Sequence, residues 1–150
     1  MTPFNYAIVV SSYNTEITDK LLEGALKTLS AAGVHKENIS IETVPGAIEI
    51  PLVAKLLART GHYNVIICLG AIIQGETLHH EYVNEQVSQG CQQVMLEFNL
   101  PVIFGVLTTK NADQARARVD EATKHKGVEA ADAALHMVEQ VARLTAHVAS

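Results

Sequence analysis

The chain has 150 residues, a length that suits one domain with a normal hydrophobic core. Apolar residues make up 48% of it and charged residues 18%, which is typical of a globular protein and excludes a disordered one. The formal net charge of −5, without a basic cluster, argues against a nucleic-acid partner. No apolar run approaches the roughly 18 residues that a membrane-spanning helix needs.

The first residues lack the basic segment followed by an apolar one that marks a secretory signal, so the expected location is the cytoplasm. The two cysteines, Cys68 and Cys91, do not form a Cys-x-x-Cys pair, and both suit buried apolar positions in a reducing compartment. No linker, repeat or low-complexity stretch divides the chain, so we predict a single domain over residues 1–150.

Strand-like and helix-like segments alternate along the chain. The four expected strands are short and rich in apolar residues, and they cover Phe4–Val10, Ile39–Val44, Val65–Gly70 and Pro101–Leu107. The expected helices repeat apolar residues at helical intervals, and they cover Thr15–Ala32, Pro51–Arg59, a segment from Thr77–His80 to Glu97, Ala112–Lys124 and Val128–His147. This alternation predicts an α/β fold in which a parallel sheet carries helices on both faces.

Local signals add detail to these elements. The Ile39–Val44 run alternates apolar and polar residues, as an edge strand does. Gly90 lies inside the third helix, where it costs about 1 kcal/mol relative to alanine, so it predicts close packing. Asn14 or Thr15 is expected to cap the first helix. The last helix has more apolar positions than one face of a small sheet requires, which leaves a two-sided core helix and a subunit contact as equal alternatives.

The loop after the third strand has the spacing Gly70-x-x-x-x-Gly75-Glu76-Thr77, which is close to a nucleotide-binding phosphate loop. Glu76 stands where that motif needs a lysine, and this argues against nucleoside triphosphates. Backbone N–H groups of Gly75, Glu76 and Thr77 could still hold one phosphate at a helix start. The alternative is an ordinary tight turn between a strand and a helix.

If the sheet is parallel, four loops meet at its carboxyl edge, and only His79 and His80 there suit proton transfer near neutral pH. Adjacent helical residues point about 100° apart and no second ligand stands four residues away, so no metal site is expected. His79 alone is either catalytic or structural. Tyr13 is either a core aromatic or a ring that stacks on a planar ligand.

Basic residues after the fourth strand have ordinary interpretations. Arg116 and Arg118 suit solvated surface charges, and Lys124-His125-Lys126 suits a basic turn. No Ser/His/Asp or Cys/His arrangement supports covalent hydrolysis.

Six blocks of sequence, in order and with compatible spacing, resemble the lumazine synthase family. The resemblance covers nearly the whole chain, from Val9 to about Met137. The blocks are Ser12–Asn14, Val44–Pro51, Leu69–His79, Pro101–Thr109, Gln114–Arg118 and Lys126–Gly127.

The resemblance implies the condensation of 5-amino-6-(D-ribitylamino)uracil with 3,4-dihydroxy-2-butanone 4-phosphate to 6,7-dimethyl-8-ribityllumazine, with loss of phosphate and water, in riboflavin biosynthesis. It implies no metal and no redox cofactor. The implied fold is a three-layer α/β/α sandwich around a four-stranded parallel sheet with flavodoxin-like strand order. The implied assembly is a homopentamer or a pentamer-based shell with active sites between subunits, and riboflavin synthase is a further partner that the resemblance leaves open.

The same resemblance implies roles for single residues. Tyr13 would stack on the pyrimidine ring, His79 would move protons, and Arg118 from the adjacent subunit would bind the phosphate. The other implied substrate contacts are Asn14 beside the stacked ring, Ala47, Ile48 and Glu49 at the ribityl chain, Ala71, Ile72 and Ile73 at the uracil edge, Glu76 and Thr77 at the phosphate, and Phe104 from the adjacent subunit over the ring system. Lys126 matches a basic position near the substrates, and its role stays open.

The sequence departs from the family pattern at Tyr13, Ile48 and Gln74, which leaves affinity and substrate discrimination open.

Three other classes of protein also remain as alternatives. A flavin-binding module of flavodoxin type needs a phosphate loop after the first strand, which residues 11–15 match only faintly. A phospho-acceptor signalling domain needs aspartates at strand ends, where this chain has Val-Ser-Ser and Leu-Gly-Ala. A shell protein without catalysis would differ from the enzyme in activity alone.

Overall fold

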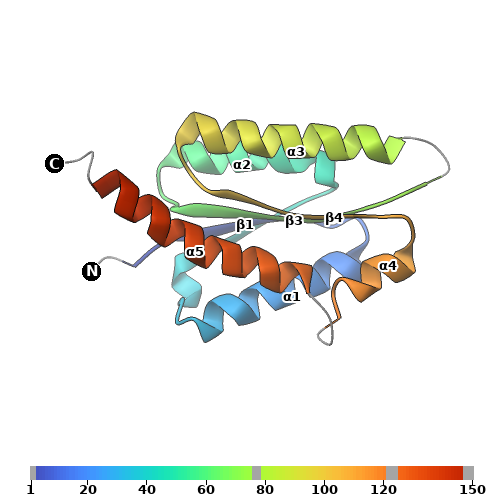
Figure 1. Cartoon of the computed structure of the whole chain (residues 1–150), viewed down its shortest axis with the longest axis horizontal. Helices are drawn as coiled ribbons and strands as arrows, with labels where there is room; N and C mark the ends of the chain where they lie inside the picture. Colours follow the sequence, from blue (N-terminus) through green and yellow to red (C-terminus); the bar gives the residue numbers. More distant parts are fainter. Residues whose placement is uncertain (1–2, 76–78, 121–124, 147–150) are drawn as a thin grey trace.

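Four parallel strands form the centre of the molecule in the computed structural model, which describes residues 3–75, 79–120 and 125–146 (Figure 1). The strand order is β2-β1-β3-β4, the flavodoxin-like order, and it confirms both the parallel sheet and the edge position of β2. The strands are β1 (Tyr6–Ser11), β2 (Ile39–Val44), β3 (Val65–Ile73) and β4 (Val102–Thr109).

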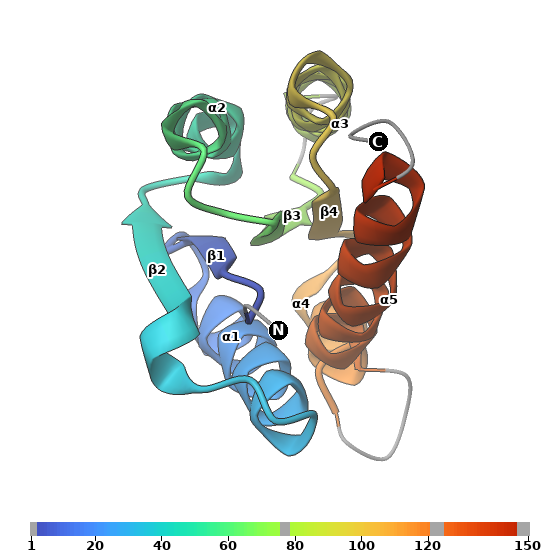
Figure 2. The same cartoon turned by 90° about the vertical axis from the view of Figure 1, so that its left-hand side faces the viewer.

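Helices cover both faces of the sheet and make three layers, as predicted (Figures 1 and 2). Helices α2 (Ile50–Thr60) and α3 (His79–Phe98) lie on one face. Helices α1 (Thr15–Ala31), α4 (Ala112–Ala117) and α5 (Lys126–Ala146) lie on the other. Two short 3₁₀ turns, η1 (Lys36–Asn38) and η2 (Ala47–Glu49), flank β2. None of the described helices combines the length and apolar character needed to cross a membrane.

Strands β1 and β3 are buried on both faces because they are central in the sheet, which explains their continuous apolar sequences. Ile8 and Ile67 point into the core beneath α1 and α5, while Val9 and Cys68 point into the core beneath α2 and α3. Cys68 and Cys91 are buried and free, as expected.

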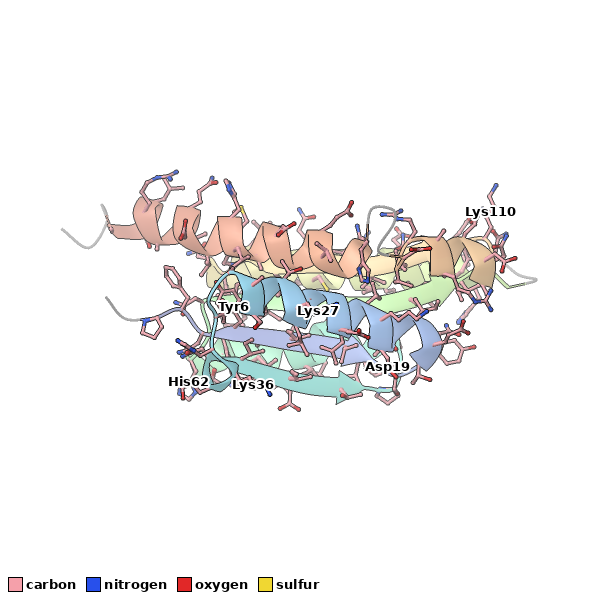
Figure 3. The ribbon with its side chains drawn as sticks, turned by 90° about the horizontal axis from the view of Figure 1, so that it is seen from below. Tyr6, Asp19, Lys27, Lys36, His62 and Lys110 are labelled. Atoms are coloured by element: carbon pink, nitrogen blue, oxygen red, sulfur yellow. The ribbon has the colours of Figure 1, made fainter. Side chains whose placement is uncertain are left out.

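Leu144 near the end of α5 is 55% exposed, but the helix buries Ala130, Ala131, Ala134 and Val138 within this one chain, where it packs against α1 and the sheet. This supports the core-helix alternative for the last helix. The view from below in Figure 3 also locates the two edges of the sheet: Tyr6 opens β1 at the amino edge and Lys110 follows β4 at the carboxyl edge.

Gly90 confirms the close packing expected for it. A Cβ atom at this position would lie 2.7 Å from the Pro51 Cβ atom, so α2 and α3 approach each other where a side chain does not fit. Pro51 itself lies in the first turn of α2, where its missing N–H group costs no helical hydrogen bond.

Two predicted boundaries are wrong. Strand β3 does not end at Gly70 but continues to Ile73, because β4 pairs with it as far as Thr109. The helix predicted for Ala112–Lys124 ends at Ala117, because the chain turns there and the Arg118 carbonyl accepts a hydrogen bond from the Lys126 N–H at 2.8 Å. Residues 121–124 lie outside the described part of the chain.

Candidate active site

A pocket of about 350 Å³ opens at the carboxyl edge of the sheet, beside the neighbouring strands β1 and β3. In this strand order the chain leaves β1 and β3 toward opposite faces, and such a switch point is where open α/β sheets bind ligands. The pocket is lined by Tyr13, Gly46, Ala47, Ile48, Ala71, Ile72, Ile73, Gly75, His79, His80 and Val83. Three of the four predicted loops therefore do meet at this edge.

Tyr13 lies at the mouth of the pocket with 69% of its surface exposed, so the core-aromatic interpretation is wrong. The turn that carries it is fixed by backbone bonds: the Tyr13 N–H donates to the Pro45 carbonyl at 2.9 Å, and the Ser12 N–H donates to the Val44 carbonyl at 2.8 Å. An exposed ring on a fixed turn offers a planar surface to a planar ligand.

Asn14 begins α1 in a left-handed conformation with φ of 66°. Its carbonyl accepts the N–H groups of Ile17 and Thr18, but its side chain does not cap the helix, so the capping prediction for Asn14 is wrong. The Asn14 Nδ2 atom is buried and has no hydrogen-bond partner among the described residues. A buried donor without a partner costs free energy, and a bound ligand can supply the missing acceptor.

The turn η2 supplies further lining residues. Ala47 is buried, Ile48 is 43% exposed, and both line the pocket. The Glu49 carboxylate accepts the Gly46 N–H through Oε1 at 3.0 Å, so it fixes the turn from which it projects.

The last residues of β3 present backbone groups to the pocket. Strand β3 pairs with β1 only as far as Leu69, whereas its pairing with β4 continues to Ile73. Residues of β3 alternate between its two neighbours: the N–H groups of Ile66 and Gln74 bond toward β4, so the backbone groups of Ile72 also face β4. Those of Ala71 and Ile73 face the other side, where the described sheet has no strand neighbour beyond Leu69. These peptide groups can form hydrogen bonds with the polar edge of a heterocyclic ligand.

His79 and His80 are the first two residues of α3, and both line the pocket. Glu81 follows in the first helical turn, where a carboxylate suits the positive end of the helix. Glu76 and Thr77, predicted at the phosphate, lie outside the described residues.

Five predicted residues of the described chain do not line this pocket: Asn14, Glu49, Phe104, Arg118 and Lys126. Phe104 is half-buried on β4, on the side of α2 and α3. Arg118 follows α4, where its Nη2 atom lies 3.7 Å from Glu129 Oε2, and Lys126 begins α5 beside it. Asn14 and Glu49 directly follow the lining residues Tyr13 and Ile48, so within one chain the structure brings most predicted residues together. It leaves Phe104, Arg118 and Lys126 elsewhere in the fold.

A family model for 6,7-dimethyl-8-ribityllumazine synthase matches residues 3–142. The chain belongs to the 6,7-dimethyl-8-ribityllumazine synthase family. Proteins of that name from three strains of Coxiella burnetii (CbuG_Q212, RSA 493 / Nine Mile phase I and Dugway 5J108-111) are each 52% identical to it over 136 residues, which cover 91% of this chain and 90% of theirs.

A solved structure of a de novo designed Rossmann fold protein also matches, with 17% identity and a TM-score of 0.40, over 80% of this chain and 98% of that one. Membership in the lumazine synthase family does not favour the flavodoxin-type carrier or the shell protein without catalysis.

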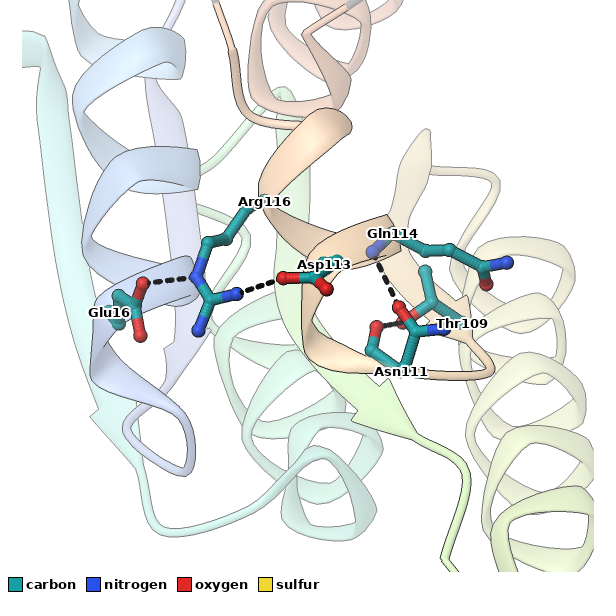
Figure 4. A network of polar contacts seen from close by, with 6 residues as sticks. All are labelled: Glu16, Thr109, Asn111, Asp113, Gln114 and Arg116. Atoms are coloured by element: carbon teal, nitrogen blue, oxygen red, sulfur yellow. Dashed lines mark hydrogen bonds and ion pairs between the residues drawn. The ribbon is translucent and has the colours of Figure 1, made fainter.

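In this lumazine synthase family member, Arg116 connects two helices, a role that sequence reasoning missed (Figure 4). Its Nε–H donates to Glu16 Oε1 and its Nη1–H donates to Asp113 Oδ1, each at 2.6 Å. The hydrogen bond and charge of Arg116 lower the pKa of Glu16, and Glu16 raises the pKa of Arg116. The pair joins the start of α1, next to Tyr13, to α4.

The same network fixes the start of α4. The Asn111 side chain accepts the Gln114 N–H at 2.8 Å, which confirms the capping potential of the Thr108–Asn111 turn, and the Gln114 side chain accepts the Lys110 N–H at 2.8 Å. The spacing of Asn111 and Gln114 was a usable sequence signal, whereas no sequence signal pairs Glu16 with Arg116, 100 residues away.

His125 corrects the prediction of a solvated basic turn, because it is only 8% exposed. Its ring lies over Gly24 of α1, and a Cβ atom at Gly24 would collide with it. Among the described residues, no three His, Cys, Asp or Glu side chains are grouped as metal ligands.

Proposed function

We propose that this chain catalyses the condensation of 5-amino-6-(D-ribitylamino)uracil with 3,4-dihydroxy-2-butanone 4-phosphate to 6,7-dimethyl-8-ribityllumazine. The observation that carries the proposal is the family match over residues 3–142. The pocket at the β1/β3 switch point supports it, because residues from three of the resembling blocks line that pocket.

The aminouracil occupies the described pocket. The exposed ring of Tyr13 stacks on the pyrimidine, and the backbone of Ala71 and Ile73 pairs with its polar edge. Asn14 Nδ2, which is buried without a partner in the described chain, donates to a substrate oxygen. The ribityl chain lies along Ala47 and Ile48, with Glu49 as acceptor for its hydroxyl groups.

The reaction needs proton transfers and two reactants held in register. The aromatic amine adds to the ketone, water leaves to give an imine, phosphate is eliminated, and the ribitylamino nitrogen closes the ring with loss of a second water. His79 lies in the pocket and supplies and accepts protons at the departing and attacking groups. Binding both reactants in one site lowers the barrier by several kcal/mol on its own.

The phosphate binds at the start of α3, where helix N–H groups and the helix dipole favour an anion. Gly75, Glu76 and Thr77 provide the loop, and Arg118 of an adjacent copy provides a cationic partner with bidentate geometry. Arg118, Lys126 and Phe104 do not line the pocket of their own chain, which supports a site completed by a second copy.

The chain therefore acts as an oligomer, and we propose the pentamer, alone or in a shell. Exposed apolar side chains on α2 and α3 support subunit contacts there, since such residues mark interaction surfaces when they gather on one face. They are Leu52, Leu56, Tyr82 and Leu96. The single domain of residues 1–150 works in the cytoplasm, and riboflavin synthase is a candidate partner.

The test supplies both substrates to the purified protein and follows the fluorescent lumazine product. Turnover is expected for the wild type. His79→Ala should lower kcat by about a hundredfold, the scale of lost acid–base catalysis, whereas the control His62→Ala, on the turn before β3, should leave it unchanged. A yellow, redox-active protein without turnover would instead favour the flavodoxin-type alternative.

Solution mass completes the test. Light scattering is expected to give a multiple of five chains, and co-sedimentation with riboflavin synthase tests that partner. A monomer that turns over both substrates at full rate would contradict the shared site.

A further inference from the structure

The start of α5 is capped by a histidine. His125 precedes the first helical residue, Lys126, and its carbonyl accepts the Glu129 N–H at 3.0 Å. Its ring Nδ1 accepts the Gly127 N–H at 3.1 Å and the Val128 N–H at 3.4 Å. Ser, Thr, Asp and Asn usually fill this role with a side-chain oxygen, so an imidazole nitrogen replaces that oxygen here.

Arg118 satisfies the remaining N–H group of this turn. Its carbonyl accepts the Lys126 N–H at 2.8 Å, and its guanidinium lies 3.7 Å from the Glu129 carboxylate. The first three N–H groups of α5 are thereby all bonded, one to Arg118 and two to His125. The position of Arg118 relative to Lys126 consequently depends on the turn that His125 holds.

The ring of His125 is itself fixed by close packing. It lies against Gly24 of α1, where a Cβ atom would overlap it, and Gly127 meets the Leu21 carbonyl of the same helix so closely that no side chain fits. Because both contacts need glycine, α1 holds the cap from one side. The ring also borders a cavity of about 540 Å³ whose charged lining residues are Lys20, Glu23 and Lys27 of α1 together with Arg116 and Asp120.

We propose that His125 is a positioning residue for the phosphate-bearing substrate. Its neutral ring, protonated on Nε2 and unprotonated on Nδ1, caps α5 and so places Arg118 and Lys126 for the phosphate of the butanone substrate in the site that they share with an adjacent copy. This inference rests on the proposed condensation and adds a residue that does not itself touch the substrate.

The test compares His125→Ala with His125→Asn in the full chain, using both substrates. Both variants are neutral, so charge effects on the five surrounding charged residues cancel between them. His125→Ala should raise KM for the phosphate-bearing ketone about tenfold, the scale of a lost helix cap, with KM for the aminouracil within twofold. His125→Asn should restore most of the affinity, because the amide oxygen can accept the same N–H groups. The matched control is His136→Ala, an exposed residue of α5 that pairs with Gln140.

Equal rises in both KM values, or a His125→Asn variant no better than His125→Ala, would overturn the proposal. If His125→Ala does not fold, two measurements on folded protein test whether the His125 ring caps α5. Nitrogen-15 NMR of the wild type should show His125 as the Nε2–H tautomer, and an Nδ1–H tautomer would contradict the cap. Amide exchange at Gly127 and Val128 should be slow in the wild type and His125→Asn. Absence of turnover by the wild type would refute the condensation itself, whereas these NMR readouts test the cap separately.

Discussion

Asn14 carries two local costs in the free protein. Its φ of 66° lies in the left-handed region, which disfavours a side chain with a Cβ atom, and its Nδ2 atom is buried without a partner in the described chain. The Asn14 carbonyl accepts hydrogen bonds from Ile17 and Thr18, but no group of the described residues accepts from its Nδ2 atom. A residue retained under strain beside a pocket is better explained by what it does when the pocket is filled.

Replacing Asn14 with glycine should therefore separate stability from binding. Asn14→Gly is expected to raise the free energy of unfolding by about 0.5–1 kcal/mol, because it removes the strain and the buried amide, while raising KM for the aminouracil. Thermal unfolding and steady-state kinetics measure the two effects. Asn99→Gly is the matched control: Asn99 also has a positive φ, of 51°, but is exposed and does not line the pocket, so its replacement should leave KM unchanged.

The Glu16–Arg116 pair makes a prediction about titration. Arg116 is the main cause of the lowered pKa of Glu16, so Arg116→Gln should move that pKa upward toward its ordinary value, which side-chain carboxyl NMR measures directly. The contribution of the pair to stability is present above the ordinary carboxyl pKa and is lost as the pH falls through the lowered pKa of Glu16. Arg143→Gln, near the end of α5, serves as control. An unchanged Glu16 titration in Arg116→Gln would mean that the pair does not persist in solution.

At the scale of elements, sequence patterns predicted the strands and helices that are defined by their own residues. The continuous apolar runs of β1 and β3, the alternation of β2 and the cap at Asn111 are such cases. The patterns missed what depends on a distant partner: β3 extends past Gly70 because β4 pairs with it, and His125 is buried because Gly24 leaves room for its ring. The pocket residues were predictable because parallel strands bring their carboxyl ends together.

The contact between α2 and α3 gives a prediction at this scale. Gly90→Ala should gain up to about 1 kcal/mol of helix propensity, but the new Cβ atom would lie 2.7 Å from Pro51. Overpacking usually costs about 1–3 kcal/mol, so the net effect should be destabilising. Denaturant unfolding measures it. Ser88→Ala, at a half-buried position of the same helix, should be neutral or slightly stabilising, and a Gly90→Ala variant more stable than wild type would contradict the packing.

For the whole molecule, the site residues fall into two groups on one chain. Tyr13, Ala71 and His79 line the pocket, whereas Arg118 and Lys126 lie together at the junction of α4 and α5. If each active site takes one group from each of two neighbours, every subunit serves two sites.

Mixing two defective variants tests this division. His79→Ala and Arg118→Ala should each be nearly inactive alone. Co-assembled in equal amounts, they should regain activity at about a quarter of the sites, where an intact His79 from one chain meets an intact Arg118 from the next. Subunits assembled separately and then combined are the control. Mixed assemblies without any gain would place both residues in the site of one chain.

The free backbone edge of β3 bears on how this pocket tolerates mutation. Every residue except proline keeps both the N–H and the C=O of its peptide group, so other substitutions at Ala71, Ile72 or Ile73 leave these donors and acceptors in place. An inhibitor whose heterocycle pairs with that edge would consequently meet few routes to resistance there.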